Sequence, residues 1–133
     1  MKPSVIKNQI EDGSIKVEVD KLYKTMKILK TAPEFNYNYL TNLTAVDYQE
    51  YLEVIYHLYS LQTGNRLEVK VEVDSQTPKV PSVMNIWGAA NWQEREVYDM
   101  FGITFNGHSN LKRILLTDDF EGHPLRKDFK LST

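Results

Sequence analysis

The side chains best suited to chemistry are concentrated between Asn91 and Phe129. Glu94, Arg95, Glu96 and Asp99 place three carboxylates and one guanidinium within six residues. Paired carboxylates can act as general acid and base, but two helical residues two positions apart do not face each other. Arg95 and Asp99, four positions apart, can pair. We therefore favour a salt-bridged or interface-paired helix face over a catalytic carboxylate pair.

Histidines offer a second kind of chemistry, because His108 and His123 flank Asp118 and Asp119. A metal-dependent hydrolase using these four residues is an alternative that metal analysis of the purified protein would decide. The chain has none of the spacings HxH, HxxxH or HExxH. It also lacks cysteine, which excludes thiolate nucleophiles, disulfides and iron–sulfur ligation. We interpret Gly107-His108 and Gly122-His123 as turns instead.

Length and charge limit the remaining classes of function. The 133 residues suit one domain, and the net charge of −2 argues against nucleic acid as the main partner. The chain contains no run of about 18 apolar residues and no apolar signal-peptide region near its start. It has no glycine-rich phosphate loop. We expect a soluble, cytoplasmic interaction module.

Alternating apolar residues predict the strands that would support this module. The strongest prediction is a hairpin, whose arms are Leu52–Leu58 and Leu67–Val73 on either side of Thr63-Gly64-Asn65. Residues 15–19 and 39–46 predict two further strands. The outward residues of the second arm, Glu68, Lys70, Glu72 and Asp74, should face water or cover an edge.

Two helices should pack on this sheet. Asp20 is placed to cap a helix over residues 21–30, and Ser82 to cap one running to about Met100. Ile86, Ala90, Val97 and Met100 or Phe101 would form the apolar face of the second helix, which Gly102 would end. We thus predict an α+β fold, with a small mixed or antiparallel sheet, a central hairpin and two main helices.

The end of the chain has a different character. We divide the single domain into an α+β part, residues 1–103, and the C-terminal tail, residues 104–133. Only Leu111–Leu116 in this tail could form a short strand or a helical turn. A structureless segment of about 30 residues is uncommon in a compact domain, and this one is rich in large apolar residues. We therefore expect the C-terminal tail to dock onto a partner.

Three runs of the tail region carry a specific resemblance. They are ERExxDMFGIxFxGH from Glu94 to His108, LxRIL from Leu111 to Leu115, and GxPLRKDF from Gly122 to Phe129. Their order and spacing resemble the C subunit of the proton-pumping NADH:quinone oxidoreductase, the thirty-kilodalton subunit family of respiratory complex I. One departure is Ser109, because members commonly have proline after the Gly-His pair.

The resemblance implies a non-catalytic structural subunit. Such a subunit would sit in the hydrophilic arm, peripheral to the membrane on its cytoplasmic side. It would dock onto the D subunit, the forty-nine-kilodalton-like protein of the complex, and onto its neighbours. It would hold no cofactor, since NADH, FMN, Fe–S clusters and quinone belong to partner subunits. Its docking and salt-bridge residues would be Glu94, Arg95, Glu96, Asp99, His108, Arg113, Arg126, Lys127 and Asp128.

The resemblance also predicts the effect of a substitution. Arg126→Ala should weaken assembly while leaving the isolated domain folded, since truncating one partner of a buried interfacial charge pair costs about 2–5 kcal/mol. The alternative within the superfamily is a small subunit of an energy-converting membrane-bound [NiFe] hydrogenase or a related complex, which carries similar runs.

Overall fold

The computed structural model describes residues 2–129. Along the chain the elements are α1 (Pro3–Gln9), β1 (Ser14–Lys16), the 3-10 turn η1 (Val19–Lys21), α2 (Leu22–Thr31), β2 (Tyr39–Asp47), β3 (Tyr51–Tyr59), β4 (Arg66–Asp74), β5 (Lys79–Pro81), α3 (Ala90–Phe101) and β6 (Thr104–Asn106). This order confirms the predicted α+β class.

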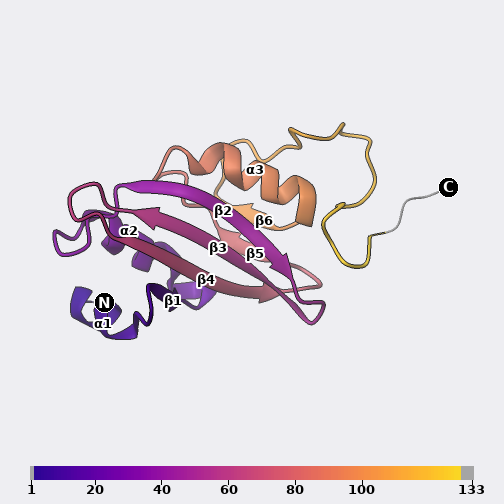
Figure 1. Ribbon diagram of the computed structural model, residues 1–133. Helices are drawn as coiled ribbons and strands as arrows, with labels where there is room; N and C mark the ends of the chain where they lie inside the picture. The colour runs from indigo at the N-terminus through magenta and orange to yellow at the C-terminus, as the bar shows by residue number, and fades with distance from the viewer. Residues whose placement is uncertain (1, 130–133) are drawn as a thin grey trace.

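The main sheet has the strand order β1-β4-β3-β2 (Figure 1). β2, β3 and β4 are antiparallel neighbours, whereas β1 runs parallel to β4. The predicted hairpin is confirmed, because Leu52 pairs with Val73, and Tyr56 with Val69. The apolar residues of both arms are buried on one face, as their alternation requires.

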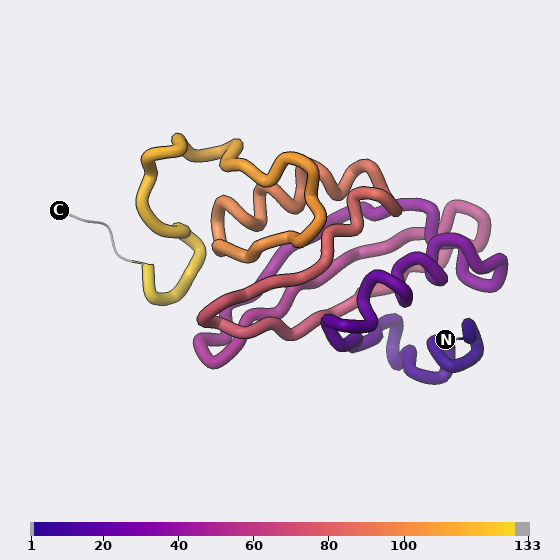
Figure 2. Tube along the Cα trace, turned by 180° about the vertical axis from the view of Figure 1, so that it is seen from behind, coloured from indigo at the N-terminus to yellow at the C-terminus, as the bar shows by residue number. Residues whose placement is uncertain are grey.

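Both main helices pack on that apolar face. α2 buries Leu22, Met26 and Leu29, which belong to the same core cluster as the buried residues of α3. In Figures 1 and 2, α1 and α2 lie together over one end of the sheet, and α3 lies along β2 toward the other end. The opposite face carries the charged residues of β4, with Glu72 and Asp74 exposed.

The start of α3 differs from the prediction. The helix begins at Ala90, and Ser82 caps no helix. Pro81 is the last residue of β5, which pairs in parallel with β6, so the chain is still extended there. A turn at residues 84–86 follows, so Ile86 precedes the helix. The end of α3 was predicted correctly, since Gly102 has φ 76° and donates its N–H to the Tyr98 carbonyl oxygen at 2.9 Å.

Several short elements also differ from the predictions. β1 ends at Lys16 because the chain turns into η1, and Asp20 lies within η1 and caps nothing. α1, β5 and β6 were not predicted, since each has seven residues or fewer and little periodicity. Residues 111–116 form neither a strand nor a helical turn.

A substitution in the hairpin tests the core. Leu52 is fully buried, so Leu52→Ala should lower the free energy of unfolding by about 2–5 kcal/mol. The control is Leu61→Ala in the β3–β4 turn, where the side chain is 61% exposed and the loss should be small. Urea unfolding measures both. Equal losses for the two variants would contradict the assigned core.

Candidate functional site

Helix α3 is buried on two opposite sides. Ala90, Glu94, Val97 and Phe101 recur at helical spacing and face the sheet. Asp99 lies nine residues after Ala90, about two and a half turns, and therefore projects from the other side of the helix. Its side chain is nevertheless completely buried. The C-terminal tail provides this cover.

The Asp99 carboxylate is the centre of the tail. Its Oδ2 accepts the backbone N–H groups of Ile114, Leu115 and Leu116 at 3.2, 2.8 and 2.9 Å. Its Oδ1 lies 3.1 Å from Nη1 of Arg113, whose side chain is 10% exposed. Charge-assisted hydrogen bonds of this kind are about twice as strong as neutral ones. The carboxylate therefore fixes the backbone of an otherwise irregular segment.

The predicted pairing of Arg95 with Asp99 is wrong. Arg113 takes that position, because the tail brings its guanidinium into the buried side of α3. Arg95 lies further out on the helix, where its Nε donates to the Lys112 carbonyl oxygen at 3.3 Å. The Arg95 guanidinium also lies 5.7 Å from the centre of the Trp92 ring.

His123 and Arg113 together connect the Gly122 turn to the end of α3. The Nδ1 of His123 lies 2.9 Å from the Asp99 carbonyl oxygen, so that nitrogen must carry the hydrogen. Arg113 Nη2 donates to the Gly122 carbonyl oxygen at 2.6 Å. A Cβ at Gly102 would lie 2.7 Å from the His123 ring. Gly102 is therefore needed both for its left-handed backbone and for the close approach of His123.

Arg126 fastens the end of the tail to the domain. Its Nε lies 3.3 Å from Asp47 Oδ2, and its Nη1 and Nη2 donate to the carbonyl oxygens of Phe101 (3.2 Å) and Ser75 (2.7 Å). The Lys127 N–H also donates to Asp47, at 2.8 Å. Burial alone would raise the pKa of the Asp47 carboxyl, but the N–H groups of Lys127 and Gln49 and the Arg126 guanidinium together hold it below its usual value.

His108 forms a separate turn. Its Nδ1 accepts the Asn110 N–H at 3.0 Å, so its Nε2 carries the hydrogen and donates to the Asn91 carbonyl oxygen at 2.9 Å. Gly107 and Gly122 both have φ of 87°, which confirms the two predicted turns. Neither His108 nor His123 meets two other possible ligands, since no group of His, Asp or Glu within residues 2–129 could hold a metal ion.

Glu94 occupies a core position on α3. It is completely buried, and its carboxylate accepts the Ser82 hydroxyl at 2.5 Å and the Val83 N–H at 2.8 Å. Burial raises the pKa of Glu94 to about 7, although both hydrogen bonds act against this rise. The Tyr56 hydroxyl is buried without a hydrogen-bond partner in the described chain. Burial and the Glu94 charge raise the pKa of Tyr56 well above its usual value.

The nine predicted residues thus differ in where their side chains bind. Glu94, Asp99, Arg113 and Arg126 point inward and bind other parts of the same chain. Arg95 and His108 contact backbone carbonyl oxygens nearer the surface. Within residues 2–129, the structure shows no side-chain hydrogen bond or ion pair for Glu96, Lys127 or Asp128.

Sequence reasoning missed one functional partner, the Asp47 carboxylate that pairs with Arg126. A signal for it was present, because Leu43, Ala45 and Asp47 alternate along β2 and so share its inward face.

Comparison with known proteins identifies the chain. A sequence profile described as "Respiratory-chain NADH dehydrogenase, 30 Kd subunit" matches residues 15–133. The chain belongs to this respiratory-chain subunit family. The match confirms the assignment made from the ERExxDMFGI and GxPLRKDF runs.

Individual relatives in the family agree. The C subunit of the NADH-quinone oxidoreductase of Moorella thermoacetica is 47% identical over 130 residues, covering 96% of this chain and 86% of that protein. The corresponding C subunit of Roseiflexus sp. is 46% identical over 123 residues, covering 90% and 71%.

Two solved structures share the fold. The trypsin-resistant fragment (1-134) of Nqo5 is 34% identical with a TM-score of 0.67, covering 74% of this chain and 81% of that one. A chain of the membrane-bound sulfane sulfur reductase, an archaeal respiratory membrane complex, is 32% identical with a TM-score of 0.77, covering 89% and 71%. Within residues 2–129 of this chain, every helix is too short or too polar to span a lipid bilayer.

Removing the Asp99 charge should loosen the tail. In Asp99→Asn the amide hydrogens of Ile114, Leu115 and Leu116 lose a charged acceptor, and their exchange with solvent should accelerate roughly ten- to a hundredfold. Hydrogen exchange followed by NMR measures this directly. Glu96→Gln on the same helix is the control and should leave the three rates unchanged. Rapid exchange of these amides in the wild-type chain would contradict the assigned hydrogen bonds.

Glu94 predicts a specific pH dependence of stability. Its pKa is about 7 in the folded chain and near 4.5 when unfolded, so the unfolded state releases the proton first as pH rises. The stabilisation should be fully present below about pH 4.5 and fall as pH rises through 7, by on the order of 3 kcal/mol. Asp47 titrates below this window, because its pKa is lowered.

Glu94→Gln should remove this part of the pH dependence, because the amide does not ionise. Urea unfolding at pH 5 and pH 8 compares the two proteins, with Glu96→Gln as the matched control that retains the wild-type slope. A wild-type chain equally stable at both pH values would refute the role given to Glu94.

Proposed function

We propose that this chain is the non-catalytic C subunit of a proton-translocating NADH:quinone oxidoreductase. In this role it stabilises the hydrophilic arm by docking onto the D subunit and its neighbours. It joins the membrane complex peripherally on the cytoplasmic side, and the redox cofactors belong to its partners. The observation that carries the proposal is the match to the C subunit of such complexes over nearly the whole chain, at 47% identity in one relative.

The arrangement of the tail supports a structural role. Asp99, Arg113, His123 and Arg126 bind backbone groups or ion-pair partners within the chain, as expected of residues that hold the tail in place. Glu94, Asp99, Arg113 and Arg126 would give the docking surface its shape. Its outer polar contacts would come from Arg95, Glu96, His108, Lys127 and Asp128.

The contacts of Arg126 change the expected effect of Arg126→Ala. This side chain joins the tail to β2, to the end of β4 and to the end of α3. The substitution should therefore weaken assembly by releasing the tail from the domain, and some loss of stability of the isolated chain should accompany it.

A second candidate has support of its own. The structural relative in the archaeal sulfane sulfur reductase covers 89% of this chain, and that respiratory membrane complex is named for a different reaction. A small-subunit role in such a complex, or in an energy-converting [NiFe] hydrogenase, is therefore the alternative to membership of complex I.

Affinity purification of the tagged full-length chain from native membranes tests both candidates. Recovery of the D subunit with other NADH:quinone oxidoreductase subunits is the expected result. Recovery of a nickel hydrogenase or sulfur reductase large subunit would instead select the second candidate. If no large-subunit partner is recovered, the structural role itself is wrong.

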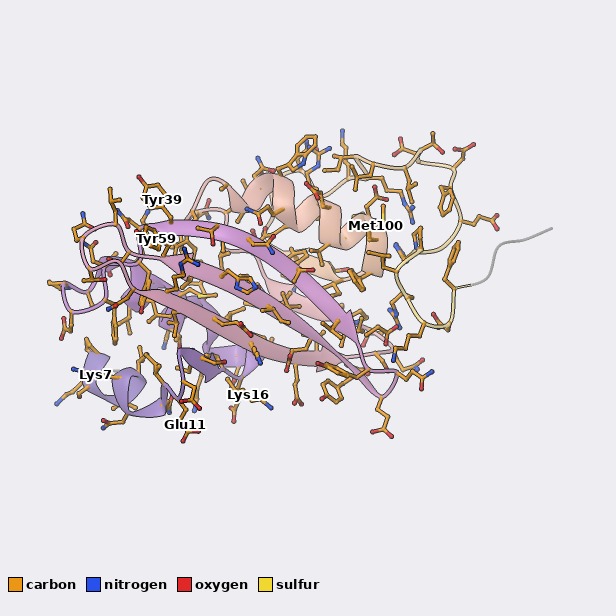
Figure 3. The ribbon with its side chains drawn as sticks, viewed as in Figure 1. Lys7, Glu11, Lys16, Tyr39, Tyr59 and Met100 are labelled. Carbon is orange, nitrogen blue, oxygen red and sulfur yellow. The ribbon has the colours of Figure 1, made fainter. Side chains whose placement is uncertain are left out.

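Charge reversals locate the contact in the same experiment. Glu96→Lys combined with Asp128→Lys should reduce the recovery of the D subunit, because both side chains are free to meet a partner and reversal creates like-charge contacts. The control reverses Lys7 and Glu11, which Figure 3 shows at the N-terminal end of the domain, far from Met100 and the tail. A greater loss from the control would place the docking surface elsewhere.

A further inference from the structure

Glu94 is a carboxylate in the core of the domain. It is completely buried on the sheet side of α3, whereas the other buried acid of this helix, Asp99, lies on the opposite side and pairs with Arg113. The two oxygens of Glu94 have different partners. Its Oε1 lies 2.5 Å from the Ser82 hydroxyl oxygen, and its Oε2 accepts the Val83 N–H at 2.8 Å. Both partners belong to the segment between β5 and α3.

The surrounding elements give Glu94 no positive partner. The titratable side chains that they bury or half-bury on this side of the main sheet are Lys30, Tyr37, Asp47 and Tyr56. Asp47 is ion-paired with Arg126, and Lys30 donates to the Ile86 carbonyl oxygen at 2.6 Å. Burial raises the pKa of both tyrosines, which therefore stay neutral, and β5 and β6 bury no charged residue. Within residues 2–129, Glu94 thus makes no ion pair.

The two protonation states of Glu94 place different hydrogens between it and Ser82. A carboxylate only accepts, so the Ser82 hydroxyl must donate to Oε1 when Glu94 is ionised. A neutral carboxyl can carry its hydrogen on Oε1 and donate to the Ser82 oxygen, while Oε2 still accepts the Val83 N–H. Hydrogen bonds to the ionised form are stronger, but burial without a counter-charge favours the neutral form. The two effects oppose each other and leave the Glu94 pKa at about 7.

Ser82 connects this carboxyl to the protein surface. Its Oγ also accepts the Met84 N–H at 3.2 Å. The Met84 sulfur in turn accepts the N–H of Ser109 at 3.4 Å and its hydroxyl at 3.7 Å. Ser109 is exposed in the 107–110 turn, which follows β6 beside α3 (Figure 1). A continuous series of hydrogen bonds therefore runs from the core to this exposed turn.

We infer that Glu94 is a proton-dependent switch that sets how firmly residues 82–84 and the 107–110 turn are held. The ionised carboxylate accepts strong hydrogen bonds from Ser82 and Val83 and fixes the segment before α3. Protonation weakens both bonds and frees the Ser82 hydroxyl hydrogen, which loosens Met84 and, through its sulfur, Ser109. Protonation also removes a buried charge, so the neutral form gains stability of the whole domain while the turn loses local order. This switch does not depend on which partner the chain binds.

An NMR titration of the full-length chain from about pH 5 to about pH 9 tests the switch. The amide shifts of Val83, Met84 and Ser109 should move together with one midpoint near pH 7, and Glu94→Gln should abolish this movement. His108 precedes Ser109, and an ordinary histidine titrates at about 6.5. His108→Gln is therefore the matched control, and it should leave the common midpoint unchanged.

The variant that removes the titration of Ser109 decides the outcome. Loss in Glu94→Gln with retention in His108→Gln supports the switch. The reverse pattern would assign the response of the turn to the histidine and overturn the inference. A Val83 amide that does not titrate in this range would also overturn it, because Glu94 would then not change its charge there.

A second variant tests the connection without altering the carboxyl. Ser82→Ala removes the hydroxyl that lies between Glu94 and Met84. Val83 should still titrate in this variant, because its N–H donates to Glu94 directly, whereas the titration of Ser109 should be lost. Titration of Ser109 with an unchanged midpoint in Ser82→Ala would contradict the proposed connection from the core to the turn.

Discussion

One buried carboxylate organises the part of the chain that carries the family signature. Asp99 projects from α3 on the side away from the sheet, where an isolated helix would meet water. There it accepts three consecutive backbone N–H groups and pairs with Arg113. A buried carboxylate without partners is very unfavourable, so the tail and the helix side chain require each other. The remaining contacts of the tail are arranged around this buried carboxylate.

Arg113 and Arg126 each connect distant parts of the chain. Arg113 joins α3 to the Gly122 turn, and Arg126 joins β2, the end of β4 and the end of α3. Buried ion pairs of this kind specify the geometry of the chain more dependably than they increase its net stability. The charges that suggested catalysis or docking from their number alone therefore act mainly inside the chain.

Local patterns in the sequence were sufficient for much of the fold. Strict alternation in the β3–β4 hairpin predicted both strands and their buried face, and Gly102 marked the end of α3. The predicted start of α3 was too early. Ser82 resembles an N-cap residue, but its hydroxyl donates a hydrogen bond to Glu94. Elements as short as β5 and β6 form through tertiary pairing, which local propensity does not encode. The sequence singled out the charged residues of the tail, but it did not reveal the partners within the chain that the structure gives them. Contacts such as the bond from Lys127 to Asp47, 80 residues apart, depend on the fold, and the spacing of charges in a single sequence does not reveal them.

The most direct test of this account is the backbone mobility of residues 111–129 in the isolated chain, measured by NMR relaxation. A tail ordered by Asp99 before any partner binds should give order parameters near those of rigid backbone, about 0.8 or higher. Values below about 0.6 across this segment would show that the Asp99 contacts do not order the tail of the isolated chain. That result would contradict the organising role given to Asp99.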